Sequence, residues 1–280
     1  MIGRLALAAL AAAFWLPASA LAQVSQLSTT TPTIPEASIG QTLIAGAGGQ
    51  LTGSGDPDED AVLKATADLK TRGYDSLGDH VAALRQVLAD MPRPFVREQT
   101  VGGRLVYRAD SMAGCVAFAT TLKGRDGASA REFDCKGNPY AVAAFYLGSY
   151  LNETGHYEDA IGVLDQGLEA SPTSPGLITE RNAGLMQLRR WDEVRGASQR
   201  GLEIPNLAPD DHARLLRNLG YALTELQDLD GAEAVYKQSL DLDPGNKLAQ
   251  HELAYIAGLK AGGQRTAPGQ IFRPGATPPP

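Results

Sequence analysis

The sequence predicts a mainly α protein: a solenoid of helical hairpins preceded by an α-hairpin and a small antiparallel β segment with one disulfide. Three observations predict this class. A pattern of two short amphipathic helices, clearest over residues 147–172, returns twice downstream. The spacing of apolar residues changes from about 3.6 to about 2 between residues 95 and 136. Both cysteines of the chain fall inside that second segment.

Both ends of the chain have compositions that predict no packed core. Residues 1–22 combine Arg4, an apolar run and small residues before Gln23, which is typical of a signal peptide. Residues 23–57 are rich in Ser, Thr, Pro and Gly and predict a disordered linker, and residues 262–280 predict a disordered Pro/Gly-rich tail. We therefore expect an exported protein, first in the periplasm of a Gram-negative bacterial envelope and second secreted. A retained membrane anchor is the alternative.

Residues 58–92 predict a helical hairpin. A run of acidic residues suits the N-terminus of the first helix, and Gly73 ends it. A second helix over 77–91 has one apolar face and stops at Pro92. We expect this hairpin to be a cap, or a degenerate copy of the repeat that follows.

Residues 93–140 predict the small β segment. FVREQTV and RLVYRA flank Gly102-Gly103, which can adopt the positive φ values of a two-residue hairpin turn. CVAFATTL and ASAREFDC predict two further strands around the loop KGRDG. This register places Cys115 opposite Cys135. An exported protein enters an oxidising compartment, which favours a disulfide between these two residues. Such a disulfide would stabilise the fold by about 3 kcal/mol. The spacing is unlike the C-x-x-C of a redox or metal pair.

From residue 141 onward the chain carries a 34-residue pattern. The copies at 141–174 and 213–246 place small residues such as Gly148 and Ala160 where two helix backbones approach closely, and large apolar residues between neighbouring helices. This pattern resembles the tetratricopeptide repeat (TPR) family, whose unit is a helix–turn–helix. The resemblance implies about three stacked repeats and a capping helix over residues 141–261.

The middle copy, residues 175–208, matches the pattern less well. Arg181 and Asn182 stand where Leu and Gly are expected, and Gly184 comes two residues late, so the first helix of this copy can slip in register. Residues 247–260 look like one more first helix without a second, which is the solvating cap that a repeat stack requires.

The resemblance also implies that the first helices line a concave face that binds another protein or peptide, as in a scaffold or adaptor. The expected partner-binding residues are Phe145, Ser149, Asn152, Thr179, Met186, Arg214, Arg217, Tyr221, His251 and Tyr255. Some family members use Lys and Asn on successive first helices to clamp a C-terminal carboxylate. Arg214 and Asn218 match that clamp, but Phe145, Ser149 and Glu180 replace its other members, so we expect the clamp to be absent.

Charge and missing motifs argue against other classes. The formal net charge is −7, and residues 141–261 carry eighteen acidic and ten basic side chains, which argues against a nucleic-acid partner. No Walker loop, zinc-protease helix or nucleophile elbow occurs, and the four histidines lie far apart in sequence. We expect no enzyme activity, no cofactor, no metal and no membrane span after removal of the signal peptide.

Two alternatives give the β segment a role of its own. It could hold an enzyme site, which requires a pocket that gathers Arg97, Arg104, Tyr107 or Arg108 with a carboxylate. It could instead be structural. The segment 93–140 has eight basic and five acidic residues, so it could pack on the acidic repeats of its own chain and partly fill their groove.

Overall fold

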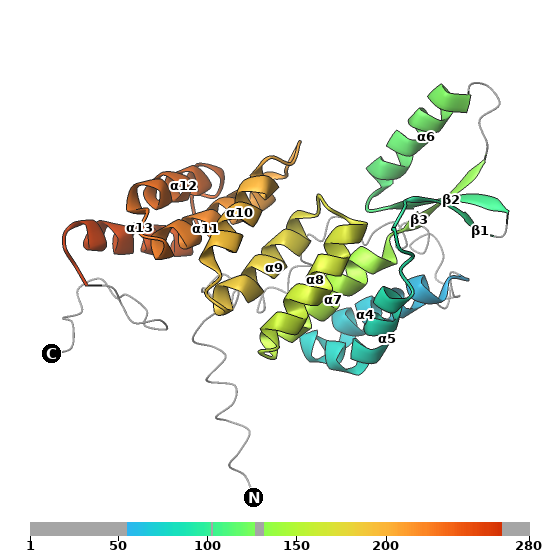
Figure 1. The fold of residues 1–280 in the computed structure, drawn as a ribbon, viewed down its shortest axis with the longest axis horizontal. Coiled ribbons are helices and arrows are strands. Elements are labelled where there is room, and N and C mark those ends of the chain that lie inside the picture. Colours follow the sequence, from blue (N-terminus) through green and yellow to red (C-terminus); the bar gives the residue numbers. More distant parts are fainter. Residues whose placement is uncertain (1–54, 102, 127–131, 265–280) are drawn as a thin grey trace, which may run out of the picture. The chain divides into compact units, whose positions relative to one another are not determined.

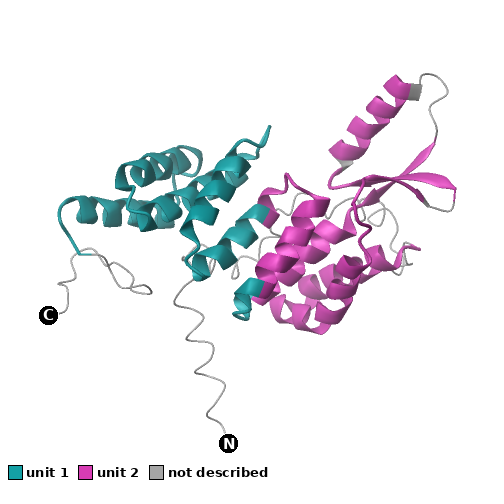
Figure 2. Ribbon diagram, in the orientation of Figure 1, with its two compact units in different colours: residues 1–25, 152–158, 178–280 teal, residues 26–151, 159–177 magenta. Residues whose placement is uncertain are grey.

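The computed structural model describes residues 55–101, 103–126 and 132–264. They divide into two compact units (Figure 2). Of the described residues, the N-terminal unit holds those in 55–151 and 159–177, and the C-terminal unit holds 152–158 and 178–264. The predicted signal peptide, almost all of the predicted linker and most of the predicted tail lie outside the described residues.

The N-terminal unit begins with the predicted hairpin. Helix α4 spans Pro57–Arg72, and the side chain of Asp56 caps it by accepting from the backbone N–H groups of Asp58 and Glu59. The predicted second helix is in two parts, because residues Tyr74–His80 form the 3₁₀ helix η1 and only Val81–Ala89 form the α-helix α5.

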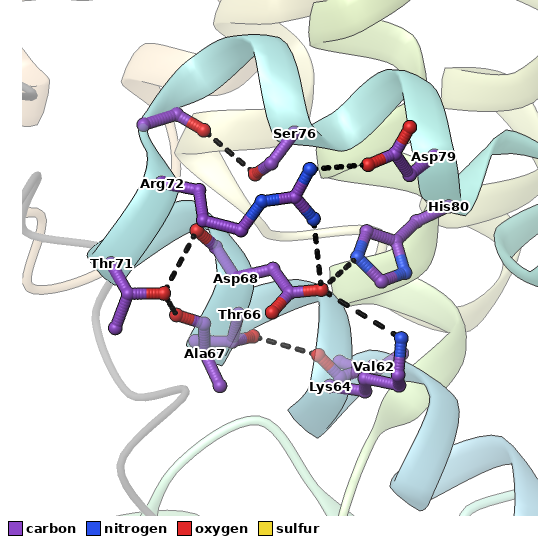
Figure 3. A network of polar contacts seen from close by, with 11 residues as sticks. Val62, Lys64, Thr66, Ala67, Asp68, Thr71, Arg72, Ser76, Asp79 and His80 are labelled. Atoms are coloured by element: carbon purple, nitrogen blue, oxygen red, sulfur yellow. Dashed lines mark hydrogen bonds and ion pairs between the residues drawn. The ribbon is translucent and has the colours of Figure 1, made fainter.

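A polar cluster around Asp68 ties η1 to α4 (Figure 3). The Asp68 Oδ2 shares a hydrogen bond of 2.8 Å with Nε2 of the buried His80, and Lys64 and Arg72 lie within 3.7 Å of the same oxygen. The hydrogen bond with His80 holds the pKa of Asp68 below its ordinary value. These contacts give the buried His80 a structural role.

The sheet has three strands in the order β1-β2-β3. Strands β1 (Glu98–Val101) and β2 (Arg104–Ala109) pair antiparallel, as the sequence predicts, whereas β3 (Phe133–Gly137) pairs parallel to β2. A parallel neighbour requires a crossover between the strands. Helix α6 (Met112–Asp126) is part of that crossover (Figure 1).

The strand predicted for CVAFATTL is therefore wrong, because these residues lie in α6. The buried side chains of this stretch are Cys115, Phe118 and Leu122, which is helical spacing. Phe118 stacks on Tyr107 of β2 with ring centroids 4.0 Å apart, and this contact seats the helix on the sheet. The Cys115–Cys135 disulfide is confirmed, but it joins a helix to a strand instead of two facing strands.

The first predicted repeat corresponds to α7 (Pro139–Glu153) and α8 (Tyr157–Ala170). A Cβ on Gly148 would stand 2.6 Å from Cδ2 of Leu164, so the two helices approach as closely as the repeat pattern predicts. Leu147 and Leu164 are fully buried in one apolar core with residues of α4 and α5.

An ionic network around Asp110 holds the sheet on this first hairpin. The Asp110 carboxylate accepts from Arg97, from Nδ2 of Asn138 at 2.8 Å and from Oγ of Ser171 at 2.7 Å. Arg97 and Asn138 also donate to the carbonyl of Ala170, the last residue of α8, each at 3.2 Å. The β segment therefore packs on its own repeat at the end of α8.

The C-terminal unit consists of five helices among the described residues. They are α9 (Pro175–Gln187, from Ile178 onward), α10 (Trp191–Leu202), α11 (Pro209–Glu225), α12 (Leu229–Leu242) and α13 (Lys247–Lys260). A Cβ on Gly220 would stand 2.7 Å from the ring of the buried Tyr236, so α11 and α12 form the same close hairpin as α7 and α8.

The misfit residues of the middle copy are accommodated by polar contacts. Asn182 is fully buried, and its Nδ2 donates to Oγ of Ser198 on α10 at 3.0 Å. Arg181 lies 3.8 Å from Glu193 of the same helix. Helix α9 is continuous through both residues, and the predicted fold class is confirmed. None of the described helices is long and apolar enough to cross a membrane.

Candidate functional site

The first predicted face residues lie in the N-terminal unit, where the chain covers them itself. Oγ of Ser149 accepts from the hydroxyl of Tyr74 on η1 at 3.1 Å. Phe145 packs against the core and lies beside Gly176. The segment that meets Ser149 is therefore η1 and not the β segment.

The remaining face residues lie in the C-terminal unit. Nδ2 of Asn152 donates to the carbonyl of Glu180 at 2.9 Å, which links the end of α7 to α9. Thr179 and Met186, also on α9, are half-buried. Asn152 therefore joins two successive first helices, as well as standing at a predicted face position.

Helix α11 brings two arginines to this face, and they differ in their partners. Nη1 of Arg217 lies 3.3 Å from Oδ2 of Asp243, and only 11% of its side chain is exposed. Burial lowers the pKa of Arg217. Arg214 is more exposed and lies 3.7 Å from Asp211 of its own helix. Arg217 is thus fixed to Asp243 after α12, whereas the ion pair of Arg214 in the described part of the chain is with its own helix.

Two donors on α11 are buried without an acceptor among the described residues. They are Nε of Arg214 and Nδ2 of Asn218. The two residues are four apart and therefore share one helix face. An unpaired buried donor costs about 1–3 kcal/mol, so such groups in native proteins call for a partner.

Tyrosines and glutamates occupy the rest of this face. Tyr221 lies edge-on to Trp191 of α10, with ring centroids 5.7 Å apart. Burial raises the pKa of Tyr221. On α13, burial and then the neighbouring Glu225 raise the pKa of Glu252 to about 7. His251 is exposed and Tyr255 is half-buried.

Residues 178–264 therefore bring most of the predicted set into one unit, while Phe145 and Ser149 belong to the other. Sequence reasoning named Asn218 only as a match to the clamp, without adding it to the expected binding residues, and did not include Glu252 among them. The repeat pattern could have supplied both, because Asn218 follows Arg214 by one helical turn and Glu252 is adjacent to His251.

A second candidate lies on the sheet in the N-terminal unit. Five residues line a cleft of about 100 Å³: Asp56, Val106, Arg108, Asp134 and Lys136. It gathers one of the predicted arginines with two carboxylates. The lining contains no Ser, Cys, Thr or His, and its two carboxylates are held in ion pairs with Arg108 and Arg104. The described residues contain no group of three or more His, Cys, Asp or Glu that could hold a metal ion.

Comparison with known proteins supports the repeat reading. Residues 213–246 match the tetratricopeptide repeat family model. RNA polymerase II-associated protein 3 of Xenopus tropicalis is 27% identical over 109 residues, which is 39% of this chain and 16% of that protein. The Mus musculus protein is 26% identical over 122 residues, 44% of this chain and 18% of that protein. The chain thus spans under a fifth of the length of these curated relatives.

Among solved structures, the first TPR of Spaghetti (RPAP3) bound to HSP90 peptide SRMEEVD is 24% identical, with a TM-score of 0.41. The match covers 44% of this chain and 95% of that chain.

The curated relatives correct the predicted localisation. They are proteins of frogs, mouse and human that are named for association with RNA polymerase II. The prediction of a Gram-negative periplasm is therefore wrong.

Proposed function

We propose that this chain is a TPR scaffold or adaptor that binds an extended peptide segment of another protein through the C-terminal unit. The binding face is formed by the first helices α9, α11 and α13. The observation that carries the proposal is the pair of unsatisfied donors on α11, Arg214 Nε and Asn218 Nδ2. A peptide backbone offers a row of carbonyl acceptors that matches two donors one helical turn apart.

The composition of the face supports a peptide over a compact ligand. Tyr221, Tyr255 and Met186 present partly covered apolar surface, and His251, one helical turn before Tyr255 on α13, is exposed. Aromatic residues, Met and Arg are the residue types enriched where proteins bind one another. The acidic pair Glu225 and Glu252 favours a partner with basic side chains over nucleic acid.

The carboxylate clamp of some TPR proteins is not part of this proposal. Phe145 and Ser149 stand at its first two positions, and Glu180 stands at its third, where its carboxylate would repel that of the peptide. We expect the peptide SRMEEVD, bound by a related domain, not to bind this chain at concentrations where chaperone clamps are saturated.

The test compares three forms of the full chain as bait in cell extract, with crosslinking and quantitative mass spectrometry. The test variant is Arg214→Ala with Asn218→Ala. The matched control is Gln199→Ala with Gln238→Ala, two exposed positions on the second helices α10 and α12.

We expect the wild type and the control to recover the same partners, and the test variant to lose them at least tenfold, since the hydrogen bond from the charged Arg214 is worth about 1.5–3 kcal/mol and that from the neutral Asn218 about 0.5–1.5 kcal/mol. Equal recovery by all three forms, with unchanged thermal unfolding, would rule out this face as the binding surface.

A further inference from the structure

The face of the sheet opposite α6 carries the small cleft described above. The parallel register aligns Val106 with Asp134 and Arg108 with Lys136. Side chains alternate along a strand, so these four share one face, while Tyr107 and Cys135 point toward α6. Asp56, the N-cap of α4, closes the cleft. At about 100 Å³ it is smaller than a cofactor pocket and has room for one small polar group with water.

The ion pairs around the cleft include each charged side chain of its lining except Lys136. Arg108 pairs with Asp56, and Arg104, at the start of the same strand, pairs with Asp134 at 2.7 Å. Among the described residues no carboxylate lies within ion-pair distance of Lys136. The lining itself has two basic and two acidic side chains, and because Asp134 pairs with Arg104, Lys136 is its one charged group without an ion-pair partner among the described residues.

Arg108 has a donor still unused. Only 6% of its side chain is exposed, one Nη donates to Asp56, and the other donates to the carbonyl of Gly137 at 3.4 Å. Its guanidinium lies 6.0 Å from the ring centre of Tyr140. The remaining Nε–H is buried and has no acceptor among the described residues. A buried donor in this position calls for an acceptor that enters the cleft.

We infer that the cleft binds a carboxylate of an extended peptide, with Arg108 and Lys136 as the donors. A planar carboxylate suits an arginine edge and an ammonium together. A phosphate dianion fits less well, because Asp56 and Asp134 are both in the lining. Strand β3 is an edge of the sheet, so a peptide can run beside it while its carboxylate reaches the cleft.

The test is a titration of the 15N-labelled full chain by NMR with three short peptides. The first, acetyl-Ala-Ala-Ala, carries a free C-terminal carboxylate. The second, acetyl-Ala-Asp-Ala-amide, carries only a side-chain carboxylate. The third, acetyl-Ala-Asn-Ala-amide, carries neither. We expect saturable shifts of the backbone signals of Val106, Asp134 and Lys136 with the first or the second peptide, and none with the third. Whichever of the two binds identifies the source of the carboxylate.

Variants of Lys136 complete the test. Lys136→Met should weaken binding at least about tenfold, because it removes a charge-assisted hydrogen bond. Lys136→Arg should restore it. Lys123→Met, an exposed lysine on α6, is the matched control and should bind as the wild type does. Saturable binding of the amide-only peptide, no saturable shift with either acid, or equal affinity in Lys136→Met would each overturn the inference. Because the C-terminal unit is unchanged in these variants, their failure would leave the proposed peptide-binding face untouched.

Discussion

Replacing Gly167 by Ala tests the close packing of α7 and α8 in the N-terminal unit. A Cβ at Gly167 would stand far inside van der Waals distance of the Cβ of Ala144, and within 3.1 Å of the side chain of Leu177. Neither Ala144 nor the backbone can move aside without shifting a helix. Overpacking of this kind costs about 1–3 kcal/mol. The intrinsic helix preference of Ala over Gly opposes it by about 0.5–1 kcal/mol.

A Gly→Ala control in the same helix allows the helix preference of Ala over Gly to be subtracted. Gly162 is exposed on α8, and a Cβ there would meet nothing within 4 Å. Gly162→Ala should therefore stabilise by about 0.5–1 kcal/mol. The difference between the two variants isolates the steric term, so Gly167→Ala should be less stable than Gly162→Ala by about 1–3 kcal/mol. The assay is urea unfolding followed by circular dichroism at 222 nm.

A double-mutant cycle identifies the contact responsible. Ala144→Gly removes the atom that the new Cβ meets, so Gly167→Ala should cost less in that background, with a coupling of about 1 kcal/mol or more. If Gly167→Ala is as stable as Gly162→Ala, or if the cycle shows no coupling, the two helices do not approach as closely as described and the reasoning fails.

Three further predictions follow from the polar and covalent contacts. Asp110→Ala leaves Arg97 without its carboxylate and should lower the free energy of unfolding by about 1–3 kcal/mol, measured as a lower urea midpoint. Cys115→Ser with Cys135→Ser should lower it by about 3 kcal/mol, and reductant should reproduce the loss in the wild type but not in the variant. Burial raises the pKa of Glu252 from its ordinary 4.5 to about 7. Between these pH values Glu252 is therefore protonated in the folded chain and ionised in the unfolded chain. Stability should therefore fall as pH rises through that window, and Glu252→Gln should flatten the pH dependence of the melting temperature; an unchanged slope would contradict the assignment.

The helical hairpins could be predicted because their signal is local. Leu147 and Leu164 are fully buried, and Gly148 and Gly220 lie at close helix contacts, all at positions that the 34-residue pattern specifies. Apolar residues at helical spacing define a buried face before any tertiary contact is known. The match of residues 213–246 to the family model rests on the same local pattern.

The β segment was predictable only in part. Its hairpin follows from a Gly-Gly turn between two alternating runs, but CVAFATTL fits a strand and a helix almost equally well. Small residues such as Ala and Thr leave the period ambiguous over eight positions. The contacts of Phe118 favour the helix, because its ring stacks on Tyr107 and meets Phe133 edge-on at 5.0 Å. These partners lie on β2 and β3, outside α6, so the sequence period alone does not reveal them.

The candidate face shows why residue type and repeat position do not identify a binding group. Arg214 and Arg217 are three residues apart on α11, and the repeat pattern turns both toward the same face. Asp243, twenty-six residues beyond Arg217, engages that arginine within the fold, whereas among the described residues Arg214 pairs only with Asp211 and keeps an unused donor. The difference between the two lies in Asp243, the C-cap residue of α12, the second helix of the same hairpin. Capacity for a partner is therefore a property of the unsatisfied groups that remain after folding, and among the described residues of α11 those are the donors of Arg214 and Asn218.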